Sequence, residues 1–322
     1  MYVVFAGGIG AARFLRGLTA AVGPAAVTAI VNVGDDIEHL GLRICPDLDS
    51  ITYWLSGSVH PEQQWGRADE RFTVAEELDR FGHPSWFTLG DRDLAVHLHR
   101  TYRLGQGASL TTVTAEIVEA FGLQLTLLPA TDDRVETRIH TADGRDLGFQ
   151  EYWVRERARP PVARVELHGA ENAHASEAVL AAIEQADAII LAPSNPVVSI
   201  GTILDIAPIR TAIQSSAAPV VGVSPIISGR VVRGMADRLL PAIGVDVSAS
   251  GVAAFYRALL DGWILDNHDA DQIQQVEALG IRCVATNTLM DELDIASELA
   301  QTCLSLAQMC SKAVDTTNGS NG

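Results

Sequence analysis

The sequence predicts an α/β protein with a doubly wound, mostly parallel sheet and an inserted, mainly helical subdomain. The first observation is that the chain opens with a strand, a glycine-rich turn, a helix and a second strand. The second is that the same alternation of apolar strands and helices returns in the second half. The third is the tryptophan-rich stretch between the halves, which contains several helical segments.

The chain begins with a predicted βαβ unit. Residues 2–6 form a short β-branched and aromatic run, which indicates a buried strand. Residues 11–18 are compatible with a helix, and residues 26–31 form a second apolar run. Such a unit spans about 30 residues and implies two parallel strands joined by a right-handed crossover.

The turn Gly7-Gly8-Ile9-Gly10 is the first candidate ligand site. Glycines let the backbone approach an anion closely, and the free N–H groups at a helix start favour negative charge. Arg13, in the first helical turn, would add a bidentate phosphate donor. The dinucleotide-binding fingerprint is incomplete, because Arg13 stands where a third glycine or alanine is expected. A tight turn without a ligand is the alternative interpretation.

Paired aspartates follow the second strand. The stretch Asn32-Val33-Gly34-Asp35-Asp36 ends that strand, and Cys45-Pro46-Asp47-Leu48-Asp49 opens a short helix, which we expect Asp47 or Asp49 to cap. Open α/β sheets bind ligands at the carboxyl ends of their strands, and carboxylate oxygens suit Mg²⁺. The sequence therefore predicts a magnesium site built from Asp35, Asp36, Asp47 and Asp49. Two solvated turns and a helix cap are the alternative.

Residues 56–164 differ in character and are predicted to be inserted between the second and third core strands. Leu89-Gly90-Asp91-Arg92-Asp93 is typical of a helix start, with acidic residues on the positive dipole. The expected elements of this stretch are helices at 72–80, at 91–103 and from the N-cap Ser109, then strands at 123–128, 135–139 and 147–153.

The second half resumes the core, which we predict to comprise residues 1–55 and 165–315. A buried strand at 188–192 runs into Pro193-Ser194-Asn195-Pro196, a stiff loop that presents polar side chains at the sheet edge. Residues 316–322 are small and polar, which predicts a disordered tail. The other expected elements are strands at 219–223, 244–248, 263–266 and 281–285, and helices at 177–185, 250–260, 270–279 and 291–313.

Composition narrows the class of protein. With 322 residues, 48% of them hydrophobic, a folded protein with a large core is expected, and the net charge of −17 argues against nucleic-acid and membrane partners. The four cysteines form no CxxC pair, and the nine histidines are scattered, so neither type predicts a metal site. The sequence shows no transmembrane run or signal peptide, which predicts a cytoplasmic protein.

The residues alone leave three functional classes open. The first is a transferase that acts on a nucleotide-activated or phosphorylated substrate. The second is an NAD(P)-dependent oxidoreductase that uses the same sheet edge. Arg13 in the fingerprint and the surplus of carboxylates disfavour this second class. The third is a nucleotide-sensing regulatory protein without catalytic activity.

Eight motifs taken together resemble one known family. The chain resembles the 2-phospho-L-lactate transferase family of coenzyme F420 biosynthesis, including its bacterial phosphoenolpyruvate-type members, over residues 1 to about 310. The motifs occur in order and are Gly7-Gly8-Ile9-Gly10, Asn32-Val33-Gly34-Asp35-Asp36, Cys45-Pro46-Asp47-Leu48-Asp49, Leu89-Gly90-Asp91-Arg92-Asp93, Leu128-Pro129-Ala130-Thr131-Asp132-Asp133, Phe149-Gln150-Glu151-Tyr152-Trp153, Ala192-Pro193-Ser194-Asn195-Pro196 and Ser224-Pro225-Ile226-Ile227-Ser228-Gly229.

The resemblance implies an activity and a fold. Members join the deazaflavin Fo to a guanosine-diphospho-activated lactate or enolpyruvate and release GMP, on a Rossmann-like core with an inserted helical subdomain. The family also suggests a homodimer. The resemblance does not distinguish lactate, enolpyruvate and glycerate as the activated acid.

The resemblance also assigns roles to residues. It places Asp49 and Arg92 at the Fo site, and the aspartates of the first two loops at Mg²⁺. Asp35, Asp36 and Asp49 are therefore the candidate catalytic residues, although the sequence does not say which of them is the general base. Diphosphate and nucleotide binding is expected at Gly7, Gly8, Gly10, Arg13, Ser194 and Asn195.

Overall fold

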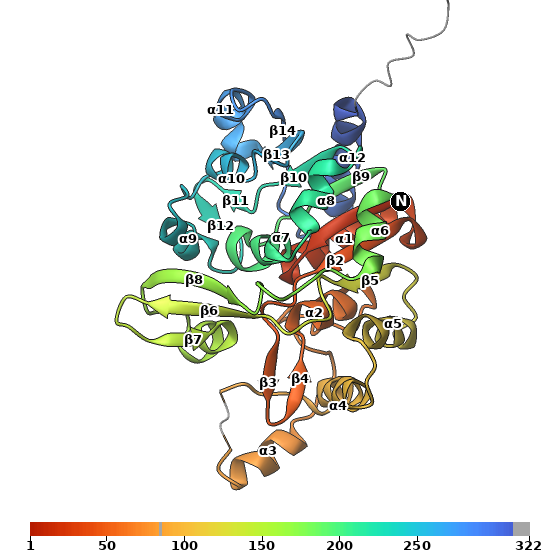
Figure 1. Cartoon of the computed structure of the whole chain (residues 1–322), viewed down its shortest axis with the longest axis vertical. Coiled ribbons are helices and arrows are strands. Elements are labelled where there is room, and N and C mark those ends of the chain that lie inside the picture. The colour runs from red at the N-terminus through yellow and green to blue at the C-terminus, as the bar shows by residue number, and fades with distance from the viewer. Residues whose placement is uncertain (84–85, 312–322) are drawn as a thin grey trace, which may run out of the picture.

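A seven-stranded parallel sheet lies at the centre of the computed structural model, which describes residues 1–83 and 86–311 (Figure 1). Its strand order is β14-β13-β10-β9-β1-β2-β5, which confirms the predicted doubly wound α/β fold. The predicted tail at 316–322 lies outside the described residues. The strands are β1 (Tyr2–Ala6), β2 (Val27–Val31), β5 (Thr126–Pro129), β9 (Ala188–Leu191), β10 (Val220–Val223), β13 (Gly262–Asp266) and β14 (Arg282–Thr286).

The strand order places a topological switch point, the position at which such folds form a binding crevice, between β1 and β9. The chain moves from β1 through β2 to β5 on one side, and then returns to the other side of β1 at β9. The connections after β1 and β9 therefore run to opposite faces of the sheet, and ligands bind in the crevice between such strands. The turn at Gly7 follows β1, and the Ser194 loop follows β9, so the two predicted binding loops flank this crevice.

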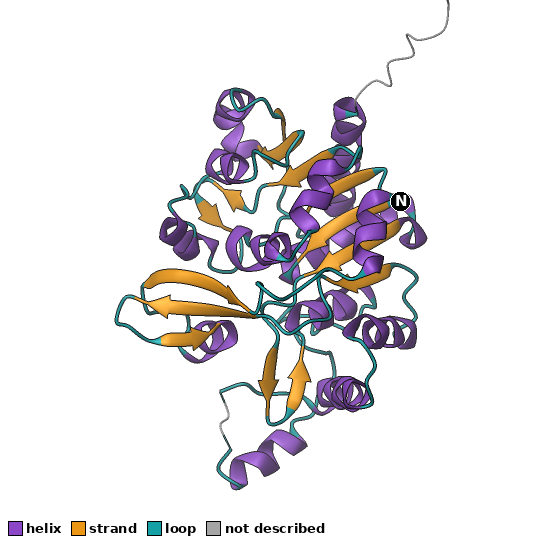
Figure 2. Cartoon of the chain, viewed as in Figure 1, coloured by secondary structure: helices purple, strands orange, loops and turns teal. Residues whose placement is uncertain are grey.

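Helices cover both faces of the sheet (Figure 2). Helices α1 (Gly8–Val22), α2 (Pro46–Leu55) and α12 (Leu293–Cys310) form one layer, in which α1 packs on the other two. Gly17 permits this close packing, because a Cβ there would lie 2.2 Å from the backbone of Ala296. The remaining helices of the second half are α6 (Glu177–Glu184), α7 (Thr202–Asp205), α8 (Ile209–Ser215), α9 (Ala236–Leu239), α10 (Ala249–Phe255) and α11 (Ile273–Glu277).

Two further units extend from the sheet edge (Figure 1). The first unit is helical and has a small core of Tyr53, Val96, Val113 and Ile117. It contains the hairpin β3 (Ile37–His39) and β4 (Leu42–Ile44), and the helices α3 (Thr73–Arg80), α4 (Asp91–Gly105) and α5 (Leu110–Ala120). Ser109 caps α5 as predicted, because its Oγ accepts a 3.1 Å hydrogen bond from the Thr112 N–H.

The second unit is an antiparallel arm with the order β7-β6-β8. Its strands are β6 (Glu136–Thr141), β7 (Asp146–Gly148) and β8 (Val162–His168). The arm shares its apolar core with Val198, Met235 and Leu239. The arm is therefore anchored to the second half of the chain. A short hairpin of β11 (Ile226–Ile227) and β12 (Arg230–Val231) lies beside α9 (Figure 1).

The structure corrects three local predictions. Strand β5 falls within the predicted insertion but pairs with β2 in the central sheet, so that insertion does not lie wholly outside the core; its limits stay a prediction. The strand expected at 147–153 ends at Gly148, because Glu151–Arg155 forms a π-helix that buries Tyr152. No strand forms at 244–248, where Gly244 has a φ of 73° and ends a short helical turn.

No helix among the described residues is long and apolar enough to cross a membrane.

Candidate functional site

The glycine turn lies against the loop that follows β9. The Gly7 N–H donates a 3.2 Å hydrogen bond to Ser194 Oγ, and a Cβ at Gly7 would lie 2.6 Å from the Ser199 Cβ. A Cβ at Gly10 would lie 2.4 Å from the carbonyl oxygen of Pro193. The need for glycine at these two positions is therefore explained by close packing of the two loops.

Gly8 differs from its neighbours. Its φ is 70°, which disfavours any other residue, and the nearest atom to a Cβ there would be Asp47 Oδ1 at 3.7 Å. The glycine turn thus brings the start of α1 directly to the first turn of α2, where Asp47 and Asp49 lie. This arrangement brings the glycine turn next to the helix start that carries these two aspartates.

Asn32 connects the aspartates to the β9 loop. Its side chain is 1% exposed and occupies the end of β2, where a dinucleotide fold has its ribose-binding acid. Its Nδ2 donates to Asp47 Oδ2 at 2.9 Å and to the Val198 carbonyl at 3.1 Å. Its Oδ1 accepts from Thr202 Oγ1 at 2.6 Å. Asn32 is therefore a structural organiser of the site, a role that the sequence analysis did not assign to it.

The four predicted aspartates are all buried but have different partners. Asp36 accepts a 2.8 Å hydrogen bond from Arg43 Nη2. Asp49 is held by both Nη atoms of Arg100, one of them at 3.1 Å. Asp35 and Asp47 have no arginine, lysine or histidine partner among residues 1–83 and 86–311. The charges of Asp36 and Asp49 are therefore compensated by arginines, whereas those of Asp35 and Asp47 are uncompensated.

Neither Asp47 nor Asp49 caps α2. The N-cap is Cys45, Pro46 occupies the first helical position, and no side chain accepts a capping hydrogen bond. The predicted cap is wrong because the Asp47 side chain bonds to Asn32 and the Asp49 side chain bonds to Arg100.

Burial shifts the pKa values of these carboxylates. It raises the pKa of Asp47 to about 7, partly offset by hydrogen bonds from Asn32 and the Gly8 N–H. Burial and then the nearby charge of Asp47 raise the pKa of Asp35 well above its ordinary value. Burial raises the pKa of Asp36 to about 6, against the opposing charge of Arg43. A cation beside Asp35 and Asp47 would remove the largest uncompensated charge.

Asp35 also offers a free ligand atom. Its Oδ1, like Asp36 Oδ1, is buried and has no hydrogen-bond partner within the described part of the chain. Buried polar atoms are normally bonded, and an exception calls for an explanation such as a missing ion. Asp35 and Asp47 therefore fit a divalent cation better than the full set of four aspartates, in which Asp36 and Asp49 are bonded to arginines.

A buried polar row on α4 supports Asp49. Arg100 is 1% exposed, and its Nη1 lies 3.2 Å from His97 Nδ1. The opposite ring atom, His97 Nε2, lies 3.3 Å from Asp93 Oδ1, which also accepts from the Tyr53 hydroxyl. Burial alone would lower the pKa of Arg100, but the Asp49 carboxylate and other neighbouring groups raise it.

The sequence analysis missed this row, although a signal was available. Asp93, His97 and Arg100 follow a spacing of four and then three residues, which places them on one face of a helix. Polar residues on a face that also carries the buried Val96 indicate an internal network. Arg43, which pairs with Asp36, lies in a short strand that the motif analysis did not interpret.

The other predicted residues are more dispersed. Arg92 is exposed at the start of α4, and the side-chain bonds of Asp49 go to Arg100. Asn195 Oδ1 accepts from the Val197 N–H at 2.9 Å, so this side chain caps the following helical turn. Arg13 lies one helical turn beyond Gly10, and its Nη2 donates to Gln64 Oε1 at 2.6 Å. Contact of Arg92 with Fo, and of Asn195 with a nucleotide, stay predictions.

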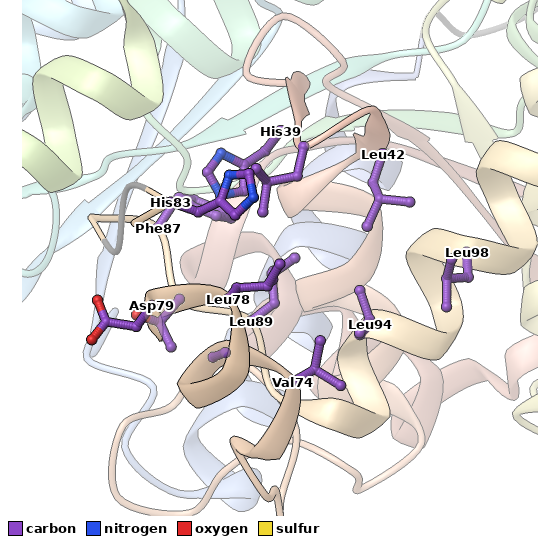
Figure 3. A pocket seen from close by; sticks show the side chains of 13 residues that line it. His39, Leu42, Val74, Leu78, Asp79, His83, Phe87, Leu89, Leu94 and Leu98 are labelled. Atoms are coloured by element: carbon purple, nitrogen blue, oxygen red, sulfur yellow. The ribbon is translucent and has the colours of Figure 1, made fainter. Parts of the chain in front are cut away.

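Two cavities lie on either side of the β3–β4 hairpin. A polar cavity of about 460 Å³ opens onto Asp36 and Arg43 and is also lined by Trp86, Arg134 and Arg138. An apolar cavity of about 260 Å³ lies between the hairpin, α3 and α4 (Figure 3). Leucine side chains project into it, and His39, His83 and Phe87 gather at one end (Figure 3). The polar cavity gives a solvent route to Asp36.

A histidine cluster lies on the arm. Among the described residues, the only three ligand-type side chains whose donor atoms lie within 4.8 Å of one another are His140, Glu166 and His168. Sequence patterns do not predict this cluster, because the antiparallel register of β6 and β8 brings distant residues together. The Arg164 guanidinium also lies 3.3 Å from His140 Nε2 and pairs with Glu166. The negative charge of Glu166 is therefore already balanced by an arginine.

The fold and site together define a class of protein. A glycine turn and buried carboxylates at the switch point of a doubly wound sheet are typical of α/β proteins that bind phosphorylated ligands. The family model described as 2-phospho-L-lactate transferase CofD matches residues 2–301, and the chain belongs to this family. This membership identifies the chain as an enzyme of the phospholactate or phosphoenolpyruvate transferase type and decides against the oxidoreductase alternative.

Similar proteins cover almost the whole chain. A phosphoenolpyruvate transferase of Streptomyces coelicolor is 49% identical over 311 residues, which is 95% of this chain and 98% of the relative. One of Thermobifida fusca is 48% identical over 318 residues, covering 95% and 97%. A Bacillus halodurans crystal structure of the upf0052 family shares the fold, with a TM-score of 0.65, 18% identity and coverage of 94% and 98%.

Proposed function

We propose that this enzyme joins the deazaflavin Fo to a guanosine-diphospho-activated enolpyruvate and releases GMP, in coenzyme F420 biosynthesis. We further propose that it works as a homodimer in the cytoplasm. The observation that carries the proposal is the buried Asp35–Asp47 pair without counter-charge, of which Asp47 lies beside Gly8 at the sheet switch point. Family membership supplies the reaction class, and the names of the relatives favour enolpyruvate over lactate or glycerate.

The reaction is a displacement at phosphorus. A ribityl hydroxyl of Fo attacks the phosphorus that carries the enolpyruvyl group and forms a new P–O bond. The bond from that phosphorus to the bridging oxygen breaks, and GMP leaves with the second phosphate. The hydroxyl proton passes to a carboxylate of the site. The protein contributes mainly by positioning the two substrates and by stabilising the charge that develops.

The residues divide this work. The bidentate bond from Arg100 fixes Asp49 in one orientation, so Asp49 can orient a hydroxyl or accept its proton. The Gly8 turn, Arg13 and Ser194 would hold the diphosphate near the start of α1. Mg²⁺ held by Asp35 and Asp47 would supply a Lewis acid for the phosphoryl oxygens and a template for the two substrates.

The direct test is product analysis. Purified protein is incubated with Fo, Mg²⁺ and GDP-activated enolpyruvate, lactate or glycerate, and the products are identified by mass spectrometry. We expect GMP and the enolpyruvyl product to appear together, with enolpyruvate used in preference to the other two acids. Release of GMP without a product that contains Fo, or no turnover with any acid, would contradict the proposal.

A further inference from the structure

Two arginines from distant segments converge on a single neutral oxygen. Arg13 Nη2 donates to Gln64 Oε1 at 2.6 Å, and Arg233 Nη1 donates to the same oxygen at 2.6 Å. Arg13 belongs to α1, Gln64 to the loop after α2, and Arg233 to the loop between β12 and α9. Two like charges at one neutral acceptor repel each other unless an anion joins them.

The positive charge is only weakly balanced. Arg13 lies 3.3 Å from Asp291 Oδ1, and the Asp291 side chain is 60% exposed, so solvent screens this pair. Arg233 has no carboxylate within 4.0 Å among residues 1–83 and 86–311. Partial burial and the neighbouring charge of Arg13 lower the pKa of Arg233. The pair therefore has capacity for a further negative charge.

The acceptor between the arginines is held in place. Gln64 has a φ of 62°, an unfavourable left-handed conformation for a residue with a side chain. Its carbonyl accepts a 3.0 Å hydrogen bond from Trp54 Nε1, and Arg233 Nη2 donates to the Gln63 carbonyl at 2.8 Å. The Arg13 guanidinium also lies over the Trp54 ring, 5.4 Å from its centre. These contacts fix both guanidinium groups before any ligand arrives.

The position of the pair indicates its ligand. Arg13 lies three residues after Gly10 on α1, the helix whose start is the proposed diphosphate site. Arg233 is exposed, which leaves the pair open to a ligand from solvent. A phosphate or diphosphate oxygen accepts hydrogen bonds from two guanidinium groups more strongly than an amide oxygen does.

We propose that Arg13 and Arg233, spaced by Gln64, form a clamp for the diphosphate of the nucleotide-activated substrate, and that Arg233 is a binding residue of this enzyme. The identity of the diphosphate rests on the proposed function, whereas the clamp itself rests on the geometry. The alternative role of these contacts is an internal latch that only joins three loops.

Calorimetric titration of inorganic pyrophosphate, and then of GDP with Mg²⁺, tests the clamp without turnover. Arg233→Gln should weaken both ligands at least about tenfold, because a charge-assisted hydrogen bond is lost. Arg230→Gln is the matched control, since Arg230 is exposed on β12 and its loss changes the net charge equally. Equal affinity of the two variants, or a wild type that binds neither ligand, would overturn the proposal.

Gln64→Glu separates a clamp from a latch. The substitution places a carboxylate between the two arginines, so both roles predict an unchanged or higher melting temperature. A clamp predicts at least about a tenfold loss of pyrophosphate affinity, because the new carboxylate occupies the anion position. A latch predicts unchanged affinity, which would overturn the proposal.

The outcomes also separate the clamp from the proposed function. Loss of pyrophosphate binding in Arg233→Gln without product from Fo in the wild type would retain the clamp and reject the reaction. Product formation by the wild type, together with normal pyrophosphate binding by Arg233→Gln, would retain the reaction and reject the clamp.

Discussion

The sheet crevice and the β6–β8 arm both gather groups that could hold a metal, but they differ in charge balance. In the crevice, Asp35 and Asp47 are buried and have no positive partner among the described residues. On the arm, Glu166 is half-exposed and already pairs with Arg164 and His140. The comparison shows that proximity of ligand-type side chains does not by itself indicate a site. Buried charge without compensation is the stronger indication, because it costs free energy that a ligand can recover.

Removal of divalent metal should have the largest effect. If the crevice binds Mg²⁺ between Asp35 and Asp47, EDTA should abolish transfer to Fo, and added Mg²⁺ should restore it. The measurement is the rate of GMP release before and after chelation. Full activity in EDTA would contradict a metal site between Asp35 and Asp47, and the crevice would then be no better a metal site than the arm.

Substitution of one aspartate in each region sharpens the comparison. Asp47→Asn should lower the transfer rate by about 100-fold or more, because the uncompensated carboxylate is lost while its shape is kept. Glu166→Gln on the arm is the control and should leave the rate within about twofold. Titration of Mg²⁺ into both variants provides the second measurement. Equal rates for the two variants would contradict the assignment of the metal to the crevice.

Removal of the arginine partner of a carboxylate should lower the free energy of unfolding more in the crevice than on the arm. Arg100→Met leaves Asp49 buried and unpaired, which should cost about 3–5 kcal/mol of unfolding free energy. Arg164→Met, which breaks the exposed pair with Glu166 on the arm, should cost less than about 1 kcal/mol. Urea denaturation of both variants gives these values. A small loss in Arg100→Met would show that Asp49 finds another partner or becomes protonated.

Much of this arrangement follows from local sequence, and some of it does not. Short apolar runs predicted β1, β2, β9 and β10. Because these strands are parallel, the polar residues after them lie at one edge of the sheet. The partners of those residues could not be predicted in the same way. Arg100 lies 51 residues from Asp49 in the chain, and tertiary packing, in which α4 contacts β4 just before the start of α2, brings them together.

The same reason explains the other errors. The run at residues 126–129 is short and has no distinctive pattern, so the sequence does not show that β5 joins the central sheet. Its position depends on the free edge of β2, with which it pairs. Arg233 follows a weak hairpin and lacks a motif, so its convergence with Arg13 depends on three separate loops. Sequence periodicity predicts elements and their ends, whereas ion pairs between elements depend on register and packing.

The pH dependence of stability should also distinguish the regions. The folded pKa values of Asp36 and Asp47, about 6 and about 7, exceed the ordinary value of 3.8. The folded state therefore binds more protons than the unfolded state between about pH 4 and 7, and the unfolding free energy from these groups falls as pH rises through that window. In EDTA, Asp47→Asn should lose part of this fall, whereas Glu166→Gln should keep it. Parallel curves for the two variants from pH 5 to 8 would contradict the raised pKa of Asp47.

The smallest effects should come from single methyl groups in the glycine turn, and they test which glycine faces a ligand. Gly10→Ala brings a Cβ to 2.4 Å from the Pro193 carbonyl, so we expect a loss of about 1–3 kcal/mol from overpacking. Gly8→Ala should cost about 1–2 kcal/mol, because its φ of 70° strains an alanine. Stability alone therefore does not separate them, but affinity for GDP with Mg²⁺ does. Gly8→Ala should weaken binding, since its methyl group would lie beside Asp47, whereas Gly10→Ala should bind normally once folded. Weaker binding in Gly10→Ala alone would place the diphosphate against the Pro193 loop and would leave Gly8 as a turn residue only.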